Sequence, residues 1–172
     1  MRVILTVVLV VLSSSAAQAQ SHQHQPYAGL ETRSIKALSD QQIADLRDGR
    51  GMSLALAAEL NGYPGPSHVL EHAEALKLTA TQREKIQDLF NSMQAEARVI
   101  GSTLVAQEGE LDSLFAKHEI DSEKLANSTR AIGETQALLR ATHLKYHLTT
   151  AELLTPEQNK HYAELRGYAS RP

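Results

Sequence analysis

Histidine is the residue type in this chain that could most readily do chemistry, with eight copies in 172 residues. Four of them form two pairs with i,i+4 spacing, His68 with His72 and His143 with His147. Residues four apart share one face of a helix, and two imidazoles so placed can chelate a divalent transition metal when another ligand completes the site. The alternative is structural, because His143 falls on an apolar seam opposite Ala97 and His72 can simply be solvated. The spacing leaves both interpretations open.

A further histidine, His22, could bind a metal once the N-terminus has been processed. Arg2 precedes an apolar run over residues 3–12, and Ala17-Gln18-Ala19 has the form of a signal-peptidase site. Residues 1–19 are therefore predicted to be a cleaved signal peptide, which directs the protein to the periplasm. Cleavage there makes His22 the third residue of the mature chain. The α-amine, two backbone amides and that imidazole could then surround Cu(II) or Ni(II) in a square plane, unless Gln20 cyclises and removes the amine.

Composition and motifs exclude several classes of function. The chain has no cysteine, which excludes disulfides and thiol chemistry, and a formal net charge of −3 argues against nucleic acid or an anionic membrane as partner. It contains no G-x-S-x-G, Walker or dinucleotide-binding glycine motif, and no H-E-x-x-H. No segment after the leader is apolar enough to span a bilayer. We therefore expect an exported protein that is not an enzyme and is not inserted in a membrane.

The histidine pairs must be positioned by helices, and the pattern predicts two long ones that fold back on each other. Apolar residues recur at alternating steps of four and three from Ile86 to His118, and again from Leu125 to Leu153. Two heptad seams of equal step predict an antiparallel hairpin over residues 80–153, with a turn at 119–121. Two residues that face each other across the hairpin should then have numbers that sum to about 240, because both helices rise by the same distance per residue.

Shorter helices are predicted on both sides of the hairpin. Their expected ranges are 39–48, an amphipathic stretch over 52–60, a two-turn helix over 68–76 and a final helix over 157–166 that stops at Gly167. Three of the predicted helices start with a leucine, a Ser or Thr cap, and a glutamine three residues after the cap. The domain organisation follows: signal peptide 1–19, disordered tail 20–26, short N-terminal helices 27–66, and hairpin domain 67–172.

Two of these helix starts carry an LTxxQ motif, at Leu78, Thr79 and Gln82 and at Leu154, Thr155 and Gln158. We interpret the threonines and glutamines as helix caps, and expect both leucines to pack against other helices. A signal peptide together with two LTxxQ motifs that flank a long helical hairpin resembles the periplasmic Spy/CpxP family, over residues 68–168. The resemblance implies a cradle-shaped dimer. It also implies an ATP-independent chaperone or an envelope-stress modulator, while related members bind zinc or sense nickel and cobalt.

The sequence thus predicts an all-α protein, a long antiparallel hairpin with short N- and C-terminal helices, which forms a hooked or cradle-shaped homodimer. Its predicted function is that of a periplasmic chaperone or stress modulator that binds unfolded or envelope proteins and requires no cofactor. The alternative is a periplasmic protein that binds or senses zinc, copper, nickel or cobalt. A third possibility is an accessory domain that only docks on another envelope protein. The segment 27–63 and the acidic charge depart from the Spy pattern.

Overall fold

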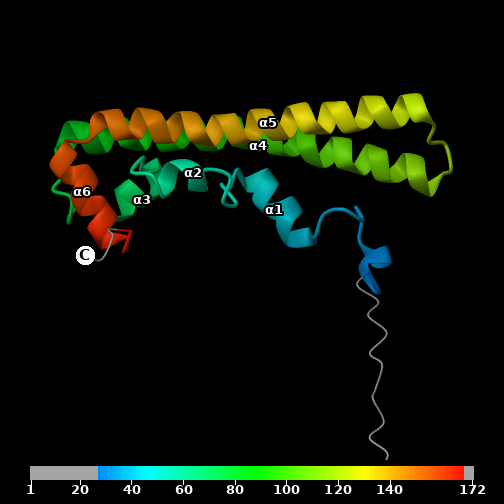
Figure 1. Ribbon diagram of the computed structural model, residues 1–172, viewed down its shortest axis with the longest axis horizontal. Coiled ribbons are helices and arrows are strands. Elements are labelled where there is room, and N and C mark those ends of the chain that lie inside the picture. The colour runs from blue at the N-terminus through cyan, green and yellow to red at the C-terminus, as the bar shows by residue number, and fades with distance from the viewer. Residues whose placement is uncertain (1–26, 169–172) are drawn as a thin grey trace, which may run out of the picture.

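The computed structural model describes residues 27–168, which fold as two layers of helices (Figure 1). The predicted all-α class and long hairpin are confirmed, while the homodimer stays a prediction. The elements are η1 (Leu30–Thr32), α1 (Asp40–Asp48), α2 (Leu56–Glu59), α3 (Pro66–Glu71), α4 (Ala80–Ala116), α5 (Ser122–Leu153) and α6 (Pro156–Leu165).

The described part of the chain contains no helix that is both long and apolar enough to cross a bilayer. The predicted signal peptide and the predicted disordered tail lie outside the described residues. Export therefore stays a prediction from the sequence.

The hairpin of α4 and α5 forms one layer. Its helices of 37 and 32 residues lie side by side and are joined by a turn in which His118 takes a positive φ of 56°. Across the pair, Tyr146 Oη donates to Glu96 Oε1 at 2.7 Å and Lys145 Nζ lies 3.0 Å from Glu96 Oε2. These contacts place the two arms close to the predicted register. The bond from Tyr146 and the bond from Lys145 lower the pKa of the Glu96 carboxyl.

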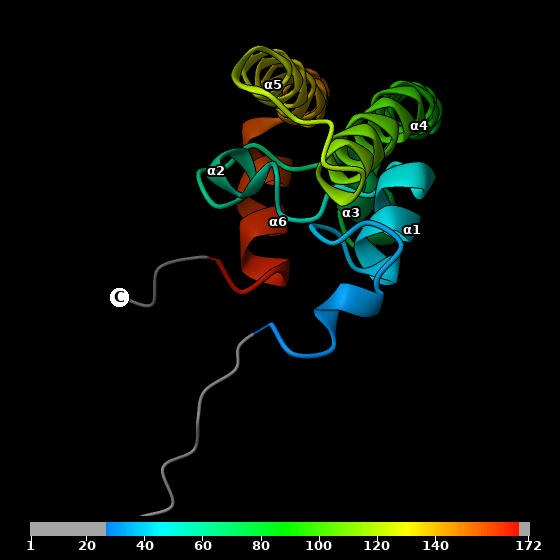
Figure 2. The same ribbon diagram turned by 90° about the vertical axis from the view of Figure 1, so that its right-hand side faces the viewer.

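The second layer consists of the short helices, which all lie on one face of the hairpin (Figures 1 and 2). Helices α3 and α6 pack at its open end. The N-terminal segment lies along the hairpin towards the turn, where the Lys36 backbone amide donates to Asp112 Oδ1 at 3.0 Å. It follows this path because Ile35, Ile43 and Leu46 cover the apolar residues in the middle of the hairpin, which are Ala97, Leu104, Val105, Ile132 and Leu139.

Helix α1 approaches α4 so closely that only glycine fits at the contact. A Cβ atom on Gly101 would stand 2.1 Å from the carbonyl oxygen of Leu46. Helix α1 then ends at Gly49, whose φ of 70° lies in the left-handed region that glycine adopts without strain. Gly101 thus allows α1 to pack closely against α4, and Gly49 ends α1 at the point where the next segment begins.

Two short elements differ from their predicted ranges. The stretch 52–60 is helical only from Leu56 to Glu59, because Met52 and Ser53 take left-handed φ values of 40° and 66° and turn the chain beneath the hairpin. Helix α3 ends at Glu71 instead of Leu76; residues 72–77 continue as turns, and Lys77, with a positive φ of 50°, redirects the chain into α4. Tertiary packing overrides the local period in both places.

The two LTxxQ motifs cap their helices as predicted and also bind each other. Thr79 and Thr155 accept from the backbone amides of Gln82 and Gln158, and each motif forms a complete capping box. Between the motifs, Gln82 Nε2 donates to Gln158 Oε1 at 2.8 Å and Gln158 Nε2 donates to Gln82 Oε1 at 3.2 Å. Leu154 and Leu78 pack beside this pair with Val69, Leu76, Ile86 and Tyr162, so the expected packing of both leucines is confirmed.

Candidate functional site

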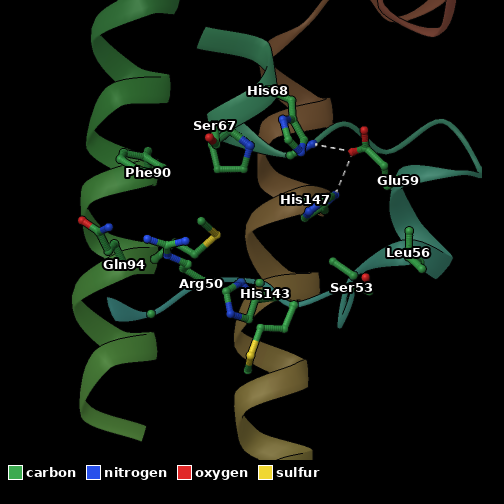
Figure 3. A pocket seen from close by; sticks show the side chains of 17 residues that line it. Arg50, Ser53, Leu56, Glu59, Ser67, His68, Phe90, Gln94, His143 and His147 are labelled. Carbon is green, nitrogen blue, oxygen red and sulfur yellow. Dashed lines mark hydrogen bonds and ion pairs between the residues drawn. The ribbon is translucent and has the colours of Figure 1, made fainter. Parts of the chain in front are cut away.

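A cavity of about 380 Å³ lies between the N-terminal segment and the open half of the hairpin (Figure 3). One wall comes from residues 49–59 and 65–68, and the other from α4 and α5. The cavity brings together three of the predicted metal ligands, His68, His143 and His147. We call it the histidine cavity.

His143 is the most buried of the three, with only 2% of its surface exposed. Its Nε2 atom is buried without a hydrogen-bond partner. Burial lowers the pKa of His143 below its usual value, and the nearby His147 lowers that pKa further, so the ring is held neutral. A buried ring nitrogen without a partner costs free energy and calls for a functional explanation.

The lowered pKa of His143 predicts a stability that depends on pH. The unfolded state takes up a proton near pH 6.5, above the pKa of the folded state, so the stabilisation is complete above about pH 6.5 and falls as the pH drops below it. We expect the urea midpoint of the metal-free protein to fall between pH 7 and pH 5, and to fall less in His143→Gln. His161→Gln, which removes an exposed histidine, is the control. A drop as steep in His143→Gln as in the parent would contradict the assignment.

His147 is oriented by the backbone. Its Nδ1 atom lies 2.7 Å from the carbonyl oxygen of Tyr63, which can only accept, so Nδ1 carries the proton and donates. In the neutral ring, Nε2 then keeps its lone pair. A histidine that binds a metal is commonly held in this way, with its other ring nitrogen donating to a carbonyl. The ring lies against Gly65, where a Cβ would stand 2.7 Å from Nε2.

Glu59 also lines the cavity, although no motif in the sequence predicts a role for it. Its buried carboxylate accepts from Tyr162 Oη at 2.5 Å and from the Gly65 amide at 3.2 Å. Arg166 Nε lies 3.5 Å from Oε1, and His147 Nδ1 lies 3.7 Å from Oε2. Burial and then the bond to Glu59 raise the pKa of Tyr162 far above its usual value, so Tyr162 remains a donor. No sequence pattern near Glu59 predicts these contacts, because its partners are spread over residues 65–166.

The predicted pair of His68 and His72 does not converge on one site. His68 lines the cavity, half-exposed, with its Nδ1 3.1 Å from Glu71 Oε2. His72 instead meets the edge of the Tyr162 ring at 6.3 Å between centroids. The structure therefore groups His68 with His143 and His147, and places His72 apart from them. His22 lies outside the described residues.

The donor types around the cavity suit a transition metal. Besides the imidazoles, the thioether residues Met52 and Met93 line it, and imidazole nitrogen binds Zn, Cu and Ni. Within residues 27–168, no three His, Asp or Glu side chains already stand close enough to hold an ion. For His68 to bind a metal in the cavity, its ring would have to leave Glu71. This is a change of rotamer in a half-exposed side chain.

A family model described as heavy-metal resistance matches residues 51–160 of the chain. That range contains α2 to α5 and the start of α6, and with them His68, His143, His147 and both LTxxQ motifs. No curated protein and no solved structure matches the chain.

Proposed function

Because the chain belongs to the heavy-metal resistance family, we propose that it is a periplasmic protein that binds a divalent transition metal in the histidine cavity. The family includes the LTxxQ proteins of the Spy/CpxP kind, so the resemblance predicted from the sequence is confirmed. The observation that carries the proposal is the unpartnered, buried Nε2 of His143 in a cavity shared with His147 and His68. A metal ion would give that nitrogen the partner it lacks.

Each ligand would have a distinct part in the site. His143 and His147 come from adjacent turns of α5 and supply two nitrogens in a fixed relation. His68 would close the site from α3, on the opposite wall. The carbonyl of Tyr63 holds His147 in the tautomer that leaves Nε2 available. The metal is cargo or signal in this proposal, and no reaction is carried out on it.

The double change His143→Ala with His147→Ala is expected to weaken binding of Zn(II), Cu(II) or Ni(II) by roughly 100-fold or more, because two ligands are lost. Isothermal titration of the mature chain measures this. All variants should also carry His22→Ala, which removes the proposed N-terminal Cu(II) and Ni(II) site from the titration.

Two further variants keep this test decisive. His68→Ala changes a half-exposed side chain, so the fold should survive while affinity falls. His161→Ala removes an exposed histidine outside the cavity and should leave affinity unchanged. Titration curves that coincide for the parent, His68→Ala and the double variant would rule out the cavity as a metal site.

A second candidate function is an ATP-independent chaperone or stress modulator, acting as a homodimer. Large apolar residues on the hairpin support it, because they remain exposed and could contact a client or a second copy: Val99, Phe115, Leu125, Leu138 and Leu148. We expect Leu138→Ser with Leu148→Ser to reduce suppression of aggregation of a denatured client without loss of helicity. The assay is run without ATP, with and without metal. Equal suppression by the variant and the parent would count against this function.

A further inference from the structure

A second cavity, of about 510 Å³, lies between α1 and α5 and shares Met52 with the histidine cavity. Its surface is mostly apolar, formed by leucines of α1, the following loop, α4 and α5. We call it the α1–α5 groove. In Figure 2, α1 lies beneath α4 and not beneath α5. The flank of α5 that faces the groove therefore stays exposed, at Gly133, Gln136, Ala137 and Arg140. The volume is within the usual range for small-molecule sites.

Gly133 is a feature of this groove that packing within the chain does not explain. Glycine in the interior of a helix lowers helix stability relative to alanine. At Gly101 that cost has a structural reason, since the backbone of Leu46 leaves no room for a Cβ. A Cβ on Gly133 would have no atom within 4 Å. A ligand that lies in the groove against the backbone of α5 would supply the missing reason.

Arg140 gives the groove its charge. It is the only charged residue among those that line the groove. Within residues 27–168, it forms no ion pair with an acidic side chain. An arginine at one side of an apolar groove complements a ligand with an anionic head and an alkyl chain, and its guanidinium binds a carboxylate through two parallel hydrogen bonds.

We propose that the α1–α5 groove binds a free fatty acid, with the alkyl chain against Leu46, Leu104 and Leu139 and the carboxylate at Arg140. The proposal does not rest on the proposed metal site, because Met52 is the only residue that lines both cavities and His143, His147 and His68 do not line the groove. The fatty acid is a ligand here, and no covalent step is involved.

The test is displacement of dansylaminoundecanoate, a fluorescent fatty acid, by laurate below its micellar concentration. Decanoate should bind about 15-fold more weakly than laurate, because each buried methylene contributes about fourfold. Dodecanol and dodecyltrimethylammonium, which lack the carboxylate, should displace the probe at least about tenfold less well. Equal displacement by laurate and dodecanol would overturn the proposal, as would better displacement by a lysophospholipid of the same chain length.

Three variants locate the site. Gly133→Leu places a side chain in open space and improves the helix, so the thermal midpoint should not fall while probe binding is lost. Arg140→Glu should weaken laurate about tenfold and leave dodecanol unchanged. Arg130→Glu, an exposed change on the same helix outside the groove, is the matched control and should bind as the parent does. Probe binding that is unchanged in Gly133→Leu would overturn the proposal, whatever the outcome of the metal titrations.

Discussion

Replacing Gly101 with alanine is expected to release α1 from the hairpin. The added Cβ would stand 2.1 Å from the carbonyl oxygen of Leu46, and a backbone oxygen cannot rotate away as a side chain could. Overpacking of this kind costs about 1–3 kcal/mol, and we expect the upper end of that range. The denaturation midpoint should fall. Relative to the parent, amide hydrogen exchange should accelerate more in residues 40–48 than in α5. The reason is that α1 loses its packing against α4, while α4 and α5 still pack against each other.

The matched control is the same substitution at Gly133, in the other arm of the hairpin. No atom lies within 4 Å of a Cβ at that position, so alanine adds helix propensity without a clash. Gly133→Ala should therefore stabilise the protein by about 1 kcal/mol. If Gly101→Ala were as stable as Gly133→Ala, the close contact between α1 and α4 would be wrong.

Replacing Glu59 with alanine is expected to be the most destabilising change at the histidine cavity. It would leave the buried hydroxyl of Tyr162, the amide of Gly65 and the guanidinium of Arg166 without their shared acceptor. Removal of one partner from a buried ionic network typically costs about 3–5 kcal/mol. Chemical denaturation measures the loss. Glu59→Gln should lose less, because its amide oxygen can still accept from Tyr162.

The control for Glu59 is Glu84→Ala, which removes an exposed carboxylate from α4. Surface changes of that kind usually stay within about 0.5 kcal/mol. Equal stability of Glu59→Ala and Glu84→Ala would show that the network around Glu59 does not hold the second layer in place.

The elements with local signals could be predicted from the sequence. Alternating steps of four and three define α4 and α5, and the turn between them follows from the loss of that period. Ser39 with Gln42 marks the start of α1, and Gly49 marks its end. Each of these signals lies within a few residues of the feature that it predicts, so no knowledge of tertiary packing is needed.

The rest depends on contacts between distant parts of the chain. Glu59 falls in the amphipathic stretch predicted over 52–60, yet its partners Tyr162 and Arg166 lie in the last helix and at its C-terminal end. His72 has the correct spacing to pair with His68, but α3 ends at Glu71 and His72 meets Tyr162 instead. Spacing fixes which residues share a face only while the helix continues, and the position where a short helix ends is set by tertiary packing.

The pairing of Gln82 with Gln158 has a consequence for how the protein recovers from unfolding. It joins residues 76 apart at the open end of the hairpin, in a chain without cysteine. A disulfide in that place would restrain the unfolded chain too and would need an oxidant to re-form. The amide pair acts only in the folded state and has no redox chemistry. The base of the hairpin can therefore re-form after unfolding under oxidising or reducing conditions alike, without any enzyme that handles thiols.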